Sequence, residues 1–177
     1  TTTVSTLTIP AGQTSTSVNI PIIDDLIDEP DETFTVGGIV ISGSTVNNDP
    51  FGTITIIDND STPVLAIGNV TVNEGSGSVS VPVILSGPSS IDTVIDVVTV
   101  TGSAGTADYT TTTTQVTILA GETATNVTIP IIDDLLVEPN ETFTVDGTLT
   151  SGNTINNSAF GTVTIIDNDV LSTNHFT

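Results

Sequence analysis

Acidic residues are concentrated in one short segment that the chain repeats. Residues 20–36 read IPIIDDLIDEPDETFTV and place six carboxylates within the nine positions 24–32. The sequence contains no Lys or Arg that could pair with them. A like-charged pair about 4 Å apart costs on the order of 4 kcal/mol at an effective dielectric constant near 20. The segment therefore predicts a binding site for an external cation, because no Lys or Arg side chain is present to offset the charge.

The acidic segment belongs to a long internal repeat. Residues 1–60 align with residues 110–169 without a gap, and 39 of the 60 aligned pairs are identical. The acidic segment returns as IPIIDDLLVEPNETFTV at 129–145, and FGTITIIDND returns as FGTVTIIDND at 160–169. Self-similarity at a constant offset is the signature of a repeat architecture.

The repeat divides the chain into three predicted parts. Residues 61–169 form one complete unit, residues 1–60 are the back part of an incomplete unit, and residues 170–177 are a tail. Half of a sandwich would expose its apolar face. We therefore expect the incomplete unit to be either a truncation or a unit completed by another chain.

Composition and alternation predict an all-β fold. Hydrophobic residues make up 36% of the chain and charged residues only 12%, with Thr, Val and Ile abundant. These residue types favour strands, and the turn residues between short alternating runs are typical of a sandwich. In the complete unit we predict seven strands, at 66–73, 78–86, 93–101, 115–119, 124–133, 142–149 and 161–167.

If successive strands run alternately up and down, the acids of each unit meet at one end. In the complete unit this predicts one acidic tip made by Glu74, Asp108, Asp133, Asp134, Glu138, Glu141, Asp167 and Asp169. In the incomplete unit the same reasoning gathers Asp24, Asp25, Glu29, Glu32, Asp58 and Asp60. By contrast, Asp92, Glu122 and Asp146 fall toward the other end or the flanks, as an internal control.

Several carboxylates on loops match a hard cation that takes six to eight oxygen ligands, and Ca²⁺ fits best. Mg²⁺ prefers a smaller octahedral shell that retains waters, and Zn²⁺ favours His or Cys. The alternative is a generic acidic surface with acids on every face. Against that alternative, 14 of the 21 acids lie in the repeated motifs at 24–32, 58–60, 133–141 and 167–169.

Aromatic residues repeat as core residues would. We predict that Phe34 and Phe143, and likewise Phe51 and Phe160, are buried in the cores of their units. Tyr109, beside Asp108, is predicted to be a packing residue.

Charge and composition exclude several classes of function. The formal net charge of −21 argues against nucleic acid and anionic membranes as partners. The chain has no Cys for a disulfide framework, and no apolar run approaches the ~18 residues needed to span a membrane. His175 is the only His, and without Cys or Lys no nucleophile–base arrangement can be assembled. We therefore expect neither an enzyme nor a small-molecule substrate.

Four motifs together resemble the Calx-β domain family: VNEGSGSVSVPVILSG (72–87), GTADY (105–109), LAGETATNVTIPIIDDLLVEPNETFTV (119–145) and GTVTIIDND (161–169). The resemblance implies an immunoglobulin-like antiparallel sandwich of about seven strands, in tandem. Calcium-sensing members of the family bind several Ca²⁺ ions at one tip. The resemblance assigns ligand roles to the eight acids of the complete unit and to the backbone carbonyl of Leu136.

Two departures from the family's sensor pattern reduce the number of acids. Leu26 and Leu135 stand where the sensors have a third Asp after the pair, and Asn59 and Asn168 interrupt the closing acidic triplet. These substitutions predict fewer ions or weaker sites.

The sequence thus predicts a Ca²⁺-stiffened repeat of an extracellular, bacterial cell-surface stalk, adhesin or fibre. Its expected partners are neighbouring repeats of the same protein. One alternative is a self-assembling extracellular filament, or homo-oligomer, in which a neighbouring chain completes the unit at 1–60. The other is a Ca²⁺-sensing regulatory module.

Overall fold

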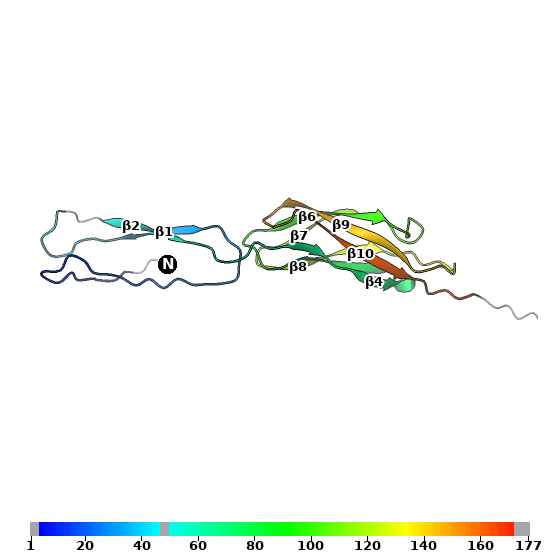
Figure 1. The fold of residues 1–177 in the computed structure, drawn as a ribbon, viewed down its shortest axis with the longest axis horizontal. Coiled ribbons are helices and arrows are strands. Elements are labelled where there is room, and N and C mark those ends of the chain that lie inside the picture. The colour runs from blue at the N-terminus through cyan, green and yellow to red at the C-terminus, as the bar shows by residue number, and fades with distance from the viewer. Residues whose placement is uncertain (1–3, 47–49, 172–177) are drawn as a thin grey trace, which may run out of the picture.

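The computed structural model describes residues 4–46 and 50–171, so His175 and the end of the predicted tail lie outside the described residues. Two units follow each other along one axis (Figure 1). The N-terminal unit carries strands β1 (Glu32–Gly37) and β2 (Phe51–Ile56), and the second unit is a sandwich. Within the described part of the chain, no helix has the length and apolar character needed to cross a membrane.

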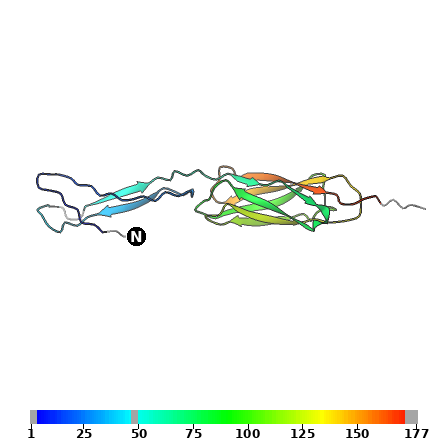
Figure 2. The ribbon, with the colours of Figure 1, turned by 90° about the horizontal axis from the view of Figure 1, so that it is seen from below.

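The second unit consists of two packed sheets, which Figure 2 shows from below. One sheet has the order β3-β5-β8 and the other the order β4-β10-β9-β6-β7. This arrangement confirms the predicted all-β sandwich. The strands are β3 (Leu65–Ile67), β4 (Val70–Asn73), β5 (Ser78–Leu85), β6 (Thr93–Thr101), β7 (Thr113–Ile118), β8 (Ala124–Pro130), β9 (Glu141–Ser151) and β10 (Ser158–Ile166).

The first predicted strand, at 66–73, is wrong in one respect: it is two strands in different sheets. β3 pairs antiparallel with β5, whereas β4 pairs parallel with β10. The crossing between the sheets is tight, because a Cβ on Gly161 would collide with the carbonyl oxygen of Gly68. Glycine at position 161 therefore permits the first strand to change sheets beside β10.

The core of the second unit is formed by alternate residues of both sheets. On β5 the buried side chains are every second residue, which is the period of a strand with one face inward. The rings of Tyr109 and Phe143 are both fully buried and stack with centroids 3.9 Å apart. The predicted packing role of Tyr109 is confirmed.

The predicted burial of Phe51 and Phe160 is wrong. Phe160 is 71% exposed and Phe51 is 79% exposed. On β10 the inward positions are Gly161, Val163 and Ile165, so Phe160 falls on the outer face. The repeat of an aromatic residue therefore reports similarity between units here and does not report burial.

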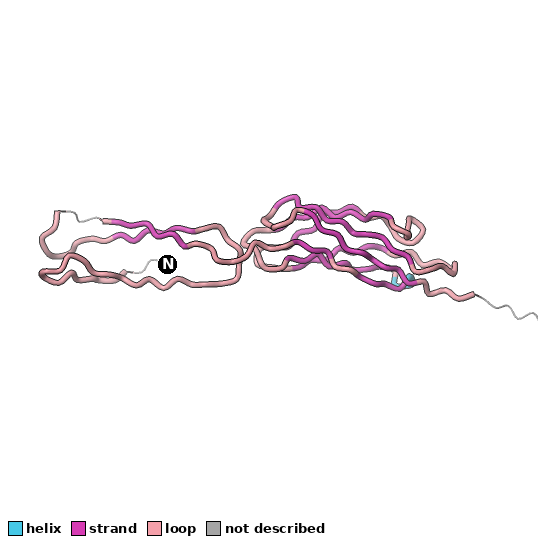
Figure 3. Tube along the Cα trace, viewed as in Figure 1, coloured by secondary structure: helices cyan, strands magenta, loops and turns pink. Residues whose placement is uncertain are grey.

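The described residues of the first unit form no core of their own. Among residues 4–46 and 50–60, Asp28 alone is buried, and most of this part is loop, drawn pink in Figure 3. Phe143 in β9 is fully buried, whereas its counterpart Phe34 in β1 is only partly buried. β1 pairs with β2, while the equivalent β9 pairs on both sides, with β10 and β6. The expected exposure of an apolar face is therefore observed.

Candidate metal centre

Glu74 is positioned by a short capped turn after β4. The 3₁₀ turn η1 spans Glu74–Ser76, and the Asn73 side chain accepts a hydrogen bond of 3.0 Å from the backbone N–H of Gly75. Gly77 ends the turn at φ +72°, a conformation that favours glycine. The turn leaves Glu74 only 4% exposed, which is unusual for a carboxylate without a cationic partner.

Asp108 is brought to the same end by pairing of its loop with the end of β8. The backbone N–H of Ile132 donates to the carbonyl of Asp108 (2.9 Å), and Thr110 donates to the carbonyl of Pro130 (3.0 Å). The N–H of Gly105 donates to Asp108 Oδ2 at 2.6 Å and fixes that side chain. Asp108 therefore lies beside the loop that carries Asp133 and Asp134.

The Asp-Asp-Leu segment after β8 folds into a local turn. Asp134 Oδ1 accepts a hydrogen bond from the N–H of Leu136 at 2.6 Å. In the first unit, Asp25 Oδ1 accepts from the N–H of Ile27 at 2.9 Å. The two units thus place their second aspartate by the same contact, which is common for Asp in turns.

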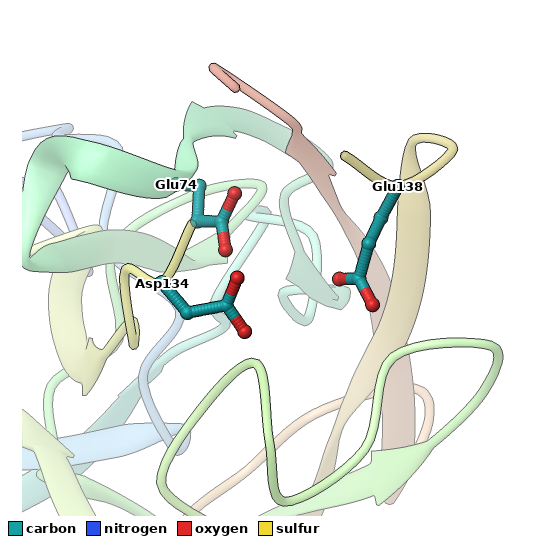
Figure 4. A group of neighbouring side chains, drawn as sticks. All are labelled: Glu74, Asp134 and Glu138. Atoms are coloured by element: carbon teal, nitrogen blue, oxygen red, sulfur yellow. The ribbon is translucent and has the colours of Figure 1, made fainter. Parts of the chain in front are cut away.

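Seven of the eight predicted acids come together in three overlapping groups. Within each group, one carboxylate oxygen of each residue lies within 4.8 Å of the others. Figure 4 shows Glu74 of the turn η1 and Asp134 and Glu138 of the loop between β8 and β9, whose carboxylates point toward a common space. Glu74 and Glu138 each belong to two groups. The groups are Glu74–Asp134–Glu138, Glu74–Asp167–Asp169 and Asp108–Glu138–Glu141.

The structure places Asp133 outside these three groups. Its Oδ1 accepts a hydrogen bond of 3.2 Å from the side-chain amide of Asn168. Asn168, which interrupts the closing acidic motif, therefore supplies a donor to the neighbouring acid. The sequence predicted Asn168 only as a lost charge, and its role as a partner of Asp133 was missed because the contact spans 35 residues.

Two sets of predicted ligands are gathered less closely. Leu136 is 61% exposed, and its N–H rather than its carbonyl makes the contact described above. The acids of the first unit line one hollow, but no three of their oxygens meet as closely as those of the second unit within the described ranges. The six acids around this hollow are Asp24, Asp25, Glu29, Glu32, Asp58 and Asp60.

Loss of solvation and repulsion between like charges raise the pKa values of several of these acids. Burial raises the pKa of Glu74, and the charges of Asp134, Asp167 and Asp169 raise it further, although a backbone hydrogen bond from Asp134 opposes them. Loss of solvation, followed by the charge of Asp108, raises the pKa of Glu141. The same causes, desolvation first and like charges second, raise the pKa values of Glu29, Asp60, Glu138 and Asp169.

The raised pKa values predict that metal-free protein gains stability on mild acidification. Glu74 and Glu141 bind protons more readily in the folded than in the unfolded state, where Glu titrates near 4.5. The ionised Glu74 and Glu141 carboxylates therefore destabilise the folded state at neutral pH. This destabilisation is lost as the pH falls through their raised pKa values toward about 4.5. We expect the urea midpoint of metal-free protein to rise over this window, followed by Tyr109 fluorescence. A midpoint that falls steadily over the same window would contradict the prediction, and Glu74→Gln should flatten the profile.

The donor set fits a hard divalent cation. All side-chain ligands in the three groups are carboxylate oxygens, and Asp169 Oδ2 is buried without a hydrogen-bond partner. A buried acceptor of this kind is costly unless a donor or a cation satisfies it. Oxygen ligands on loops suit Ca²⁺ better than Zn²⁺, which favours nitrogen and sulfur. The geometry can therefore hold a cation.

A family model described as the Calx-beta domain matches residues 1–67 and 58–169. Among curated proteins, none matches the chain. The solved structure of CBD12 from CALX1.2 is 23% identical with a TM-score of 0.50, over 59% of this chain and 46% of that one. At this identity the likeness shows the sandwich fold alone.

Two further solved structures are similar. The apo form of the Calx CBD1 domain is 20% identical with a TM-score of 0.49, over 60% of this chain and 99% of that one. The calcium binding domain CBD12 of CALX1.1 is 25% identical with a TM-score of 0.49, over 56% of this chain and 42% of that one. The matched part is thus less than half of each CBD12 chain.

Proposed function

Because the chain belongs to the Calx-beta domain family, we propose that it binds Ca²⁺ at the acidic tip of the second unit. The observation that carries this proposal is the set of three carboxylate groups, which are linked because Glu74 and Glu138 each belong to two of them. CBD12 of CALX1.1, a similar protein, is described as a calcium binding domain. The first-unit hollow lined by Asp24 and Asp58 is proposed as a second, weaker site.

The proposed role of calcium is structural. A cation that binds the folded tip but not the unfolded chain stabilises the fold by mass action. Here it would also cancel repulsion among acids that have no Lys or Arg to offset them. We propose that the chain is a calcium-stiffened repeat of an extracellular, cell-surface stalk, adhesin or fibre, whose partners are neighbouring repeats.

Several features support an extracellular, non-catalytic role. A chain without Lys or Arg offers no cleavage site to trypsin-like proteases. Tandem units joined by the three-residue segment 61–63, which includes Pro63, limit hinge motion. Calcium would then be present at steady extracellular concentrations and would act as a constant structural ligand.

Thermal unfolding tests the calcium proposal. The unfolding midpoint of the full chain is measured in millimolar Ca²⁺, in chelator, and in chelator followed by Mg²⁺. We expect a rise that is specific to Ca²⁺, because the larger ion accepts more carboxylate oxygens. An unchanged midpoint, or an equal rise with Mg²⁺, would show that the tip is an acidic surface without a specific Ca²⁺ site. Micromolar affinity with a large change of shape would instead indicate a regulatory switch.

Exposed apolar positions in the first unit favour a second candidate function, self-assembly. Ile54 and Ile20 are 37% and 38% exposed, whereas their counterparts Val163 and Ile129 are fully buried. In the second unit Val163 pairs with β4 and Ile129 pairs with β5, and both of these strands belong to residues 61–109. A neighbouring copy that supplies equivalent strands would therefore complete the first unit.

Sedimentation of the full chain at several concentrations tests self-assembly. A complex of fixed stoichiometry or a fibre would support it. A monodisperse monomer at every concentration would exclude it and would leave the calcium proposal intact.

A further inference from the structure

Asp28 lies at the junction between the two units and is 7% exposed. It belongs to the acidic segment of the first unit, yet it is not among the residues that line the acidic hollow there. Its backbone forms an isolated parallel bridge with Ser89, in the loop between β5 and β6. A buried carboxylate is unfavourable unless it is hydrogen-bonded, so its contacts explain why it is tolerated.

Every polar group of Asp28 has a partner, and most partners belong to the second unit. The backbone N–H donates to the carbonyl of Pro88 (3.2 Å), and the carbonyl accepts from the N–H of Ser90 (3.1 Å) and from its hydroxyl (3.1 Å). Asp28 Oδ2 accepts from the Asn153 amide at 2.9 Å, and Oδ1 accepts from the Thr62 hydroxyl at 3.2 Å.

These contacts tie three separate segments to one residue. Thr62 is in the segment between the units, Ser90 is in the β5–β6 loop, and Asn153 is in the β9–β10 loop. Hydrogen bonds to an ionised acceptor are roughly twice as strong as neutral ones. The carboxylate thus holds the segment between the units and the β9–β10 loop, while the backbone of Asp28 holds the β5–β6 loop.

The repeat provides a natural comparison at this position. Asp28 aligns with Val137 of the second unit, although the residues on either side are closely similar in the two copies. Val137 is 47% exposed and has no carboxylate to offer to a following unit. The same loop can therefore be built with or without the docking group.

We propose that Asp28 is the recognition residue of a joint between consecutive units. Its carboxylate docks the tip loop of one unit into the base of the next, through Asn153 and Thr62. The joint forms without a bound cation, and the residue at this position of each repeat decides whether that unit docks rigidly on its successor. A unit with Asp at this position keeps a fixed orientation relative to the next unit. A unit with Val at this position lacks the contact that fixes its orientation. The proposal does not depend on the proposed calcium site.

A distance measurement between the units tests the joint. The chain has no Cys, so Thr53→Cys on β2 and Thr117→Cys on β7 give two unique spin-label sites, both exposed. Pulsed dipolar spectroscopy of the full chain in chelator should give one narrow distance distribution. Asp28→Val, which installs the residue found at position 137, should broaden it. Asp146→Asn, in the middle of β9 opposite Phe160 and away from the loops that contact Asp28, should leave it narrow.

A second variant guards against misfolding of the first unit. Asn153→Ala removes the partner of Asp28 Oδ2 from an exposed loop of the complete unit. It should broaden the distribution as well, and the double variant should be no broader than Asp28→Val alone, because the two changes remove one shared contact. Unchanged Tyr109 fluorescence would show that the second unit remains folded.

Two results would overturn the joint. A narrow distribution in Asp28→Val would show that other contacts hold the units. A broad distribution of the parent chain in chelator that narrows on addition of Ca²⁺ would show that the cation sets the geometry. That second result would support the calcium proposal while excluding this one, so the two failures are distinguishable.

Discussion

Replacing Phe143 with alanine is expected to lower the free energy of unfolding of the second unit by about 3–5 kcal/mol. The Phe143 side chain is fully buried, and its ring stacks on Tyr109. Truncation removes apolar contacts and leaves a cavity that two packed sheets cannot readily close. Because the chain has one Tyr and no Trp, its intrinsic fluorescence reports unfolding of this unit alone.

Phe34→Ala is the matched control for this substitution. Phe34 occupies the same position of the repeat but is only partly buried, since no second sheet covers β1 in the described part of the first unit. We expect the unfolding transition seen by Tyr109 to be unchanged in Phe34→Ala. A loss of equal size in Phe34→Ala would contradict the prediction, because it would show that the stability of the second unit depends on the packing around Phe34.

The strands of the second unit could be predicted because alternation is a local signal. β5 and β6 alternate strictly between buried and exposed residues over most of their lengths. The division of the first predicted strand into β3 and β4 is also visible in the sequence. Its apolar residues change parity between Ile67 and Val70, and a change of parity means that the side chains turn to the other face.

The acidic tip could be predicted because strand direction alone brings alternate loops to one end. This reasoning needs no side-chain geometry, and the structure places Glu74 and Asp167 together as the alternation requires. The hydrogen bond between Asn168 and Asp133 depends on rotamers and on loop paths, which no spacing rule reports. It therefore emerged only from the three-dimensional structure.

Asp28 was missed for a different reason. In the sequence it is one of six acids in a motif whose charge already had an interpretation. Its distinguishing signal was the Asp-to-Val change between positions 28 and 137, at a point where the two copies are otherwise alike. Its partner Asn153 lies 125 residues away, so only the structure shows that one acid of the motif faces the next unit.

The largest effect on the proposed metal centre is expected from Glu74→Gln. Glu74 belongs to two of the three carboxylate groups and is 4% exposed. The substitution keeps the shape of the side chain and removes its charge. In Ca²⁺ at about 100 times Kd, binding stabilises the folded state by about 2.7 kcal/mol, and we expect most of this to be lost.

The same substitution should have the opposite sign without calcium. In metal-free protein, Glu74→Gln removes one of the like charges that raise the pKa of its neighbour Glu141, so the fold should become more stable. Asp146→Asn, on β9 opposite Phe160 and outside the three groups, should leave the calcium effect intact. Urea unfolding followed by Tyr109, in Ca²⁺ and in chelator, measures both signs. If Glu74→Gln changed the free energy of unfolding by the same sign and size in both conditions, Glu74 would contribute to packing alone. A carboxylate that binds the cation stabilises the fold in Ca²⁺ and, because neighbouring acids repel it, destabilises the fold in chelator, so its removal must have opposite effects in the two conditions.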